Sequence, residues 1–133
     1  MLSPILSCVD VDTSIAYYTQ KLGFEHAWSM PPNENGKTEF ACVKLGDADI
    51  LLGVVEGFVA PEDLDKRGIG LQIYIDLPAT IDIDKLYVQA QSSGANITRE
   101  IEDRNWGERT FNVKDADGYN LMLAQRIQKP GSS

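Results

Sequence analysis

The sequence predicts an α+β fold made of paired βαβββ modules whose strands form a curved, cupped mixed sheet. The main observation is a repeat: residues 43–52 and residues 113–123 each form an apolar run, a tight acidic and glycine-containing turn and a second apolar run. Upstream of each copy the sequence predicts a strand, a helix that stops at a glycine, and another strand. Two such modules can curl two small sheets around one cavity, which is where we expect a function to lie.

In the first module, residues 4–9 are expected to form a strand. Acidic and hydroxyl residues at 10–14 provide acceptors for the free N–H groups of a helix start, which explains Asp10 and Asp12 as capping residues. Ile15, Tyr18 and Leu22 form one apolar stripe, and Gly23 ends the helix. Strands are expected at residues 24–30, 38–44 and 50–55. The intervening loop holds Asn35-Gly36, a pair that type I′ turns prefer.

In the second module, the alternation of Leu71, Ile73 and Ile75 with other residues predicts a half-buried strand. A helix is expected at 82–91, closed by Gly94, and three strands at 96–101, 109–113 and 119–124. Asp115 and Asp117 are interpreted as turn residues. The expected organisation is a first module at 1–56, a linker at 57–67 with a helical turn at 61–64, a second module at 68–127 and a loose tail at 128–133.

Composition and charge exclude several classes of protein. The net charge is −8 and the basic residues are scattered, which argues against a nucleic-acid partner. We see no signal peptide and no apolar run that could cross a bilayer, so we expect a cytoplasmic protein without a membrane partner. Cys8 and Cys42 fall in strand-like stretches and are interpreted as buried packing residues.

Two motifs resemble those of the vicinal oxygen chelate superfamily, which includes glyoxalase I, extradiol dioxygenases and bleomycin-resistance proteins. The first is residues 10–18 followed by Leu22-Gly23-Phe24, and the second is Trp106-Gly107 followed by residues 115–119. Ala116 departs from the proline that the family usually has at that turn. The resemblance covers residues 3 to 126 and implies a homodimer, in which modules of two chains often complete each other's cavity.

The resemblance also implies where a metal ion would be held. Metal-using members place histidine or glutamate at four strand positions, which here correspond to Ser3, Leu51, Gly70 and Met122, with Leu71 or Gln72 as alternatives to Gly70. None of these side chains is an imidazole or a carboxylate, the donors that divalent metals need. We therefore expect no metal and no other cofactor, and a relation to the metal-free bleomycin-resistance type.

The candidate ligand-binding residues combine aromatic side chains with a few polar groups, as small-molecule sites do. Trp106 is interpreted either as a wall on which a planar ligand stacks or as a packing residue beside Gly107. Strand parity predicts that Phe40, Cys42, Gln72, Tyr74, Arg109, Asn120 and Met122 face the cavity, and Trp28 and Trp106 complete the candidate set.

Three functions are compatible with these features. We favour a protein that sequesters a small aromatic or amphipathic molecule, including cationic compounds drawn by the acidic surface. The alternative is a metal-dependent lyase, isomerase or dioxygenase with a relocated metal site, for which His26, Glu39 and Asp76 are the available donors. As the only histidine, His26 is better explained as a partly exposed strand residue. The third is a structural or regulatory partner protein, suggested only by Phe58 and Val59 in the linker.

Overall fold

The computed structural model describes residues 2–127. Its first half contains β1 (Ile5–Cys8), α1 (Val11–Lys21), β2 (Glu25–Ser29), β3 (Phe40–Leu45) and β4 (Ala48–Val54). Helix α1 begins where expected, because the Asp10 carboxylate accepts a hydrogen bond from the Thr13 backbone N–H at 3.1 Å. The helix ends before Gly23, whose φ of 78° lies in the left-handed region that favours glycine.

The second half repeats this order with β5 (Gln72–Asp76), α2 (Ile83–Ser92), β6 (Asn96–Asp103), β7 (Glu108–Lys114) and β8 (Asn120–Arg126). The connection between the halves contains η1, a 3-10 helix at Pro61–Lys66. The two repeated segments of the sequence are the β3–β4 and β7–β8 hairpins, so the expected α+β fold of βαβββ units is confirmed.

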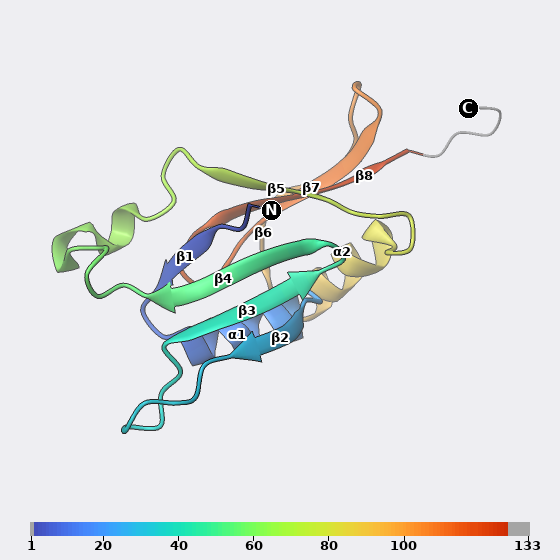
Figure 1. The fold of residues 1–133 in the computed structure, drawn as a ribbon. Helices are drawn as coiled ribbons and strands as arrows, with labels where there is room; N and C mark the ends of the chain where they lie inside the picture. The colour runs from blue at the N-terminus through green and yellow to red at the C-terminus, as the bar shows by residue number, and fades with distance from the viewer. Residues whose placement is uncertain (1, 128–133) are drawn as a thin grey trace.

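The strands form two four-stranded mixed sheets, ordered β1-β4-β3-β2 and β5-β8-β7-β6 (Figure 1). In each sheet the first strand runs parallel to the last strand of its unit, and the other pairs are antiparallel. Helix α1 packs on β3 and β4, and α2 packs on β6, β7 and β8. Each helix therefore covers one face of its own sheet.

The two helix-covered faces meet in one continuous core. Buried residues from both sheets belong to it, among them Leu6, Val43, Phe111 and Leu123. The helices also touch: the Gln89 side chain donates a hydrogen bond to the Gln20 carbonyl at 3.5 Å, and Ser93 donates to the Lys21 carbonyl at 3.3 Å. The sheet faces that carry no helix consequently point away from this core, on separate surfaces of the chain.

The acidic β7–β8 turn joins the two units in a way that its turn chemistry did not predict. One carboxylate oxygen of Asp115 accepts from the Asp117 and Tyr119 backbone N–H groups, as a turn residue does, while the other accepts from the Tyr18 hydroxyl of α1 at 2.6 Å. Asp117 accepts from Ser14 on α1 at 2.7 Å. The turn therefore holds the first helix of the chain against the second sheet.

One turn differs from its expected type. A type I′ turn needs positive φ at both central residues, and within residues 2–127 only glycines have positive φ, so Asn35-Gly36 does not form one. The loop is instead organised by Asn33, whose carboxamide oxygen accepts from the Asn35 and Lys37 backbone N–H groups at 2.9 and 3.0 Å.

The expected tail at 128–133 lies outside the described residues. Among residues 2–127 no helix is long and apolar enough to cross a membrane.

Candidate functional site

Strand register divides each sheet into a face on the shared core and an outer face. Partners directly across a ladder point to the same side of a sheet. The first outer face consists of Ile5, Ser7, Trp28, Phe40, Cys42, Leu51 and Gly53. The second outer face consists of Gln72, Tyr74, Asp76, Glu108, Thr110, Asn112, Asn120, Met122 and Ala124.

The two outer faces are equivalent by the internal repeat. Ile5 pairs with Leu51 in the first sheet, and Tyr74 pairs with Met122 in the second. The predicted residues Trp28, Phe40 and Cys42 lie on the first outer face, whereas Gln72, Tyr74, Asn120 and Met122 lie on the second. The structure thus brings the candidates together as two separate groups.

The first outer face is apolar. The Trp28 and Phe40 rings lie 5.7 Å apart between centroids, inclined at 48°. Beside them is a hollow of about 330 Å³, lined by Ile5, Ser7, Glu39, Phe40, Gly53, Val54 and Phe58. Cys42 is buried in the sheet, and this burial raises the pKa of its thiol. Aliphatic, aromatic and glycine surfaces of this kind suit a flat apolar group.

The second outer face is polar. Its hollow of about 680 Å³ is lined by Gly70, Leu71, Gln72, Thr98, Arg99, Asn112 and Asn120. The Asn112 amide donates a hydrogen bond to Gln72 Oε1 at 3.2 Å. Three neutral carboxamides therefore share one concave surface, and each can both donate and accept hydrogen bonds.

A carboxylate organises the aromatic end of the second outer face. Glu108 accepts from the Trp106 indole N–H at 2.8 Å and from the Tyr74 hydroxyl. The hydrogen bond to Glu108 raises the pKa of Tyr74 to about 12, with burial and the charge of Asp76 acting in the same direction. Trp106 is held through its ring nitrogen and remains 56% exposed, so its ring surface is accessible.

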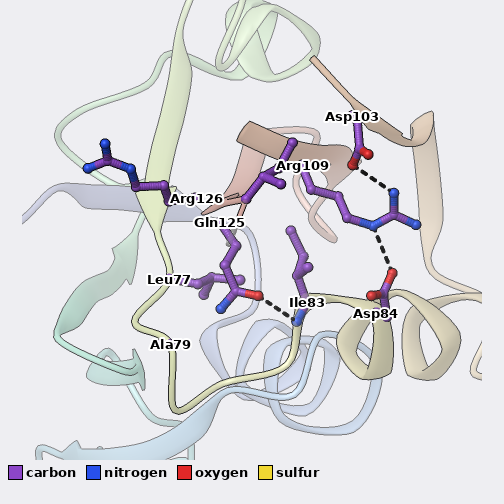
Figure 2. Close-up of a pocket in the computed structure, with 9 residues that line it drawn as sticks. Leu77, Ala79, Ile83, Asp84, Asp103, Arg109, Gln125 and Arg126 are labelled. Atoms are coloured by element: carbon purple, nitrogen blue, oxygen red, sulfur yellow. Dashed lines mark hydrogen bonds and ion pairs between the residues drawn. The ribbon is translucent and has the colours of Figure 1, made fainter. Parts of the chain in front are cut away.

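The expectation that Arg109 shares the second outer face is wrong. Arg109 pairs with Gln125 across the β7–β8 ladder, which places it on the α2 side. Its guanidinium donates to Asp84 on α2 and to Asp103 on β6, both at 2.9 Å, and these hydrogen bonds raise its pKa. Figure 2 shows Arg109 between the two carboxylates at a third hollow of about 390 Å³.

The residues at the four metal positions do not fit a divalent metal. Leu51 pairs with Ile5, and Met122 pairs with Tyr74. Ser3 lies two residues before Ile5, and Gln72 lies two residues before Tyr74. The register therefore makes Gln72 the equivalent of Ser3. Gly70 precedes β5, so the alternative Gln72 is the structural counterpart. A hydroxyl, an amide, an aliphatic group and a thioether are poor ligands for Mg²⁺, Zn²⁺ or Ni²⁺.

The relocated donors are also not assembled. His26 lies on edge strand β2, Glu39 precedes β3, and Asp76 ends β5 in the other sheet. Within residues 2–127, no group of three or more His, Cys, Asp or Glu side chains is placed to hold a metal ion.

Both outer faces are open in the single chain. Ile5 is 60% exposed, Trp28 45% and Tyr74 51%, although all three are large apolar or aromatic side chains, and all three lie on edge strands of these faces. The hollows on the two faces have no lining residue in common. Neither hollow is therefore enclosed by residues 2–127 of a single chain.

Some residues of these faces were missed by sequence reasoning. Asn112 and Glu108 on β7 could have been found, because Phe111 and Val113 alternate with polar residues and predict which side is buried. Gly53 and Ile5 carry no chemical signal of their own. They matter because the β1–β4 register brings them next to Phe40.

The fold and these faces define a glyoxalase-type protein, and comparison with family models agrees. Residues 3–123 match the model of the glyoxalase/bleomycin resistance protein/dioxygenase superfamily. The chain belongs to this superfamily.

Similar proteins cover almost the whole chain. A Vibrio parahaemolyticus protein named probable lactoylglutathione lyase is 27% identical over 132 residues, covering 96% of this chain and 91% of its own length. An uncharacterized Mycobacterium bovis protein is 25% identical over 130 residues, covering 96% and 84%.

Solved structures share the fold. TioX from Micromonospora sp. ML1 superposes with a TM-score of 0.74 at 18% identity, covering 97% of this chain and 98% of that one. A superfamily member from Sphaerobacter thermophilus gives a TM-score of 0.67 at 24% identity, covering 93% and 94%.

Proposed function

We propose that this protein binds and sequesters a small aromatic or amphipathic molecule, without a metal ion, in cups formed between two copies of the chain. Each cup consists of the first outer face of one copy and the second outer face of the other. A symmetric dimer then contains two identical cups, because a two-fold axis repeats every contact. Binding, rather than bond breaking, is the proposed activity.

The observation that carries the proposal is the separation of the candidate residues onto two outward faces of one chain. Contiguous exposed apolar surface is typical of interaction sites. Ile5 and Trp28 expose such surface on the first outer face, Tyr74 exposes a ring on the polar second outer face, and the two helices already use the other face of each sheet. A second copy supplies the missing half of each cup with no further element.

The side chains at the metal positions support a binding role over catalysis. Enzymes that use a metal as Lewis acid and template need hard or borderline donors to hold it. Ser3, Leu51, Gln72 and Met122 do not provide them. The acidic surface, with a net charge of −8, favours neutral or cationic ligands over anionic ones.

A subunit-mixing experiment tests the cup. Gly53→Val fills the hollow of the first outer face, and Gln72→Trp fills that of the second; both positions point outward, and the added Cβ at Gly53 makes only ordinary contacts of 3.4–3.6 Å. Each variant alone is expected to lose binding of Nile red, a neutral planar dye. Refolding them together at equal concentrations restores about one quarter of the sites, because half of the dimers are mixed and each mixed dimer has one intact cup.

The mixing result separates the possible arrangements. Retained binding in Gln72→Trp alone indicates cups made from two first outer faces. No recovery in the mixture, with both variants dimeric by light scattering, contradicts the proposed pairing.

The relative named probable lactoylglutathione lyase favours a second candidate, a metal-dependent lyase of the same superfamily. This candidate requires a stoichiometric divalent metal. Elemental analysis of protein purified without chelator, followed by Ni²⁺ and Zn²⁺ titration, decides between the two. One metal ion per cup supports the lyase, and binding of the dye by metal-free protein supports sequestration.

A further inference from the structure

We infer that the ligand is a flat aromatic carboxamide, with its ring on the first outer face of one copy and its amide on the second outer face of the other. This inference rests on the proposed function and adds the chemical class of the ligand.

The inference starts from an asymmetry between equivalent positions. Phe40 pairs with Gly53 in the first sheet, and Thr110 pairs with Ala124 at the same place in the second. Two residues further along these strands, Cys42 on β3 is equivalent to Asn112 on β7. The first outer face is therefore apolar where the second carries hydrogen-bonding groups, so a molecule between them needs one surface of each kind.

The apolar half of the cup has a recess at Gly53. A Cβ at this position would lie 3.4 Å from Phe40 Cδ1 and 3.6 Å from Ile5 Cγ2, so the absent side chain leaves space between those two residues. The Trp28 ring continues the same surface beside Phe40. Planar aromatic groups gain the most from a recess walled by rings and aliphatic carbon.

The polar half is built for an amide. Asn112 Nδ2 is bound to Gln72 Oε1, while Asn112 Oδ1 is buried and has no hydrogen-bond partner among residues 2–127. The Asn120 amide donates to the Leu71 carbonyl at 3.5 Å, a weak bond that leaves capacity for another partner. An unpaired buried acceptor is costly, and a ligand N–H removes that cost when the side chain turns toward it. A carboxamide supplies the N–H and also the carbonyl that the Asn and Gln amides bind.

Three naphthalene probes of similar shape test this chemistry by titration calorimetry. 2-Naphthamide has a carbonyl and N–H groups, whereas 2-acetonaphthone has only the carbonyl. 2-Naphthoate carries a negative charge, which would be attracted by Arg99 in the hollow of the second outer face. We expect 2-naphthamide to bind at least about tenfold more tightly than 2-acetonaphthone, because sites with buried polar groups reject analogues that cannot pair them.

Variants connect the preference to the second outer face. Asn112→Leu is expected to remove the tenfold difference in affinity between 2-naphthamide and 2-acetonaphthone, and Asn120→Leu, on the neighbouring strand, is expected to reduce that difference. Gln91→Leu, an exposed amide on α2, is the matched control and retains the full preference. Thermal unfolding of each variant verifies that it is folded before titration.

Each other result overturns the inference. Equal affinity for the amide and the ketone excludes a carboxamide ligand. Tightest binding of 2-naphthoate, lost in Arg99→Gln, identifies an anionic ligand instead. If Nile red binds and none of the three probes does, the ligand class is wrong while the cup remains. If Nile red does not bind either, the proposed function fails with the inference.

Discussion

Arg67 and Asp117 form an ion pair in which Nη1 lies 2.6 Å from Oδ1, with 10% and 6% of their side chains exposed. Arg67 belongs to the connection between the two units, and Asp117 to the β7–β8 turn of the second. The same guanidinium donates to the carbonyls of Ser7 and Leu64 at 2.9 and 2.8 Å. One side chain therefore joins β1, the linker and the second sheet.

Removing the cation is expected to destabilise the whole chain. Arg67→Met leaves Asp117 buried without its partner, which in comparable pairs costs about 3–5 kcal/mol. Urea unfolding followed by circular dichroism measures the change. Lys66→Met is the matched control, since Lys66 pairs with Asp63 at 3.3 Å on the surface and such pairs contribute about 1 kcal/mol or less. Equal effects of the two substitutions would contradict the structural role of Arg67.

The contact between the helices depends on a glycine. Gly23 has a φ of 78°, and a Cβ there would lie 2.8 Å from Leu86 Cδ2 of the second unit. Gly36 has a φ of 75° with no atom within 4 Å. Gly36→Ala thus measures the backbone cost alone, about 1 kcal/mol. Gly23→Ala is expected to cost about 1–3 kcal/mol more, because it adds overpacking. Equal losses in urea unfolding would mean that the helices do not meet as described.

A buried thiol and a buried phenol make the free energy of unfolding sensitive to alkaline pH. Burial raises the pKa of Cys8 from 9.0 to about 12, and burial together with Asp115 raises the pKa of Tyr18 well above 10.0. Between pH 9 and 12 the unfolded chain releases protons that the folded chain keeps, so the free energy of unfolding falls as pH rises.

Cys8→Ala is expected to reduce this slope by up to one proton, about 1.4 kcal/mol per pH unit. Urea unfolding at several pH values between 8 and 11 measures the slope. Cys42→Ala is the comparison, because it removes the other buried thiol, whose pKa is also raised by burial. If Cys8→Ala has the same slope as the wild type, Cys8 does not contribute to the pH dependence of the free energy of unfolding.

Much of the fold follows from local sequence patterns. The repeated hairpins, the capping aspartates and the glycine helix ends are signals within a few residues, and each one identifies its element. Strand parity also groups Phe40, Cys42, Gln72, Tyr74, Asn120 and Met122 on one side of their strands, and the register places all six on outer faces. Arg109 was misplaced although it lies two and four residues before Phe111 and Val113, which are both buried, and therefore shares their side of the strand. The alternation was the better guide, and Asp84 and Asp103 explain how a cation is tolerated on that side.

The relation between the two sheets could not be predicted in this way. Whether the outer faces or the helix-covered faces of one chain meet depends on contacts across about 100 residues of sequence, such as Tyr18 with Asp115. A turn aspartate and a core tyrosine are each explained locally without the other. This tertiary arrangement, and not any motif, decides that the candidate site is divided between two surfaces.

The two tryptophans can report on the closing of the cups. Trp28 is 45% exposed beside Phe40, and Trp106 is 56% exposed and bound to Glu108 at the edge of the second outer face. In the proposed dimer, the pairing of the first outer face of one copy with the second outer face of the other covers both tryptophan rings. Trp28→Phe and Trp106→Phe each leave one reporter, whose quenching by acrylamide is measured as the protein is diluted. Both reporters are expected to become more accessible over the same concentration range, which light scattering assigns to dissociation of the dimer. If only one tryptophan becomes more accessible on dilution, the dimer joins two copies of the same outer face. If neither does, the dimer forms through another surface of the chain.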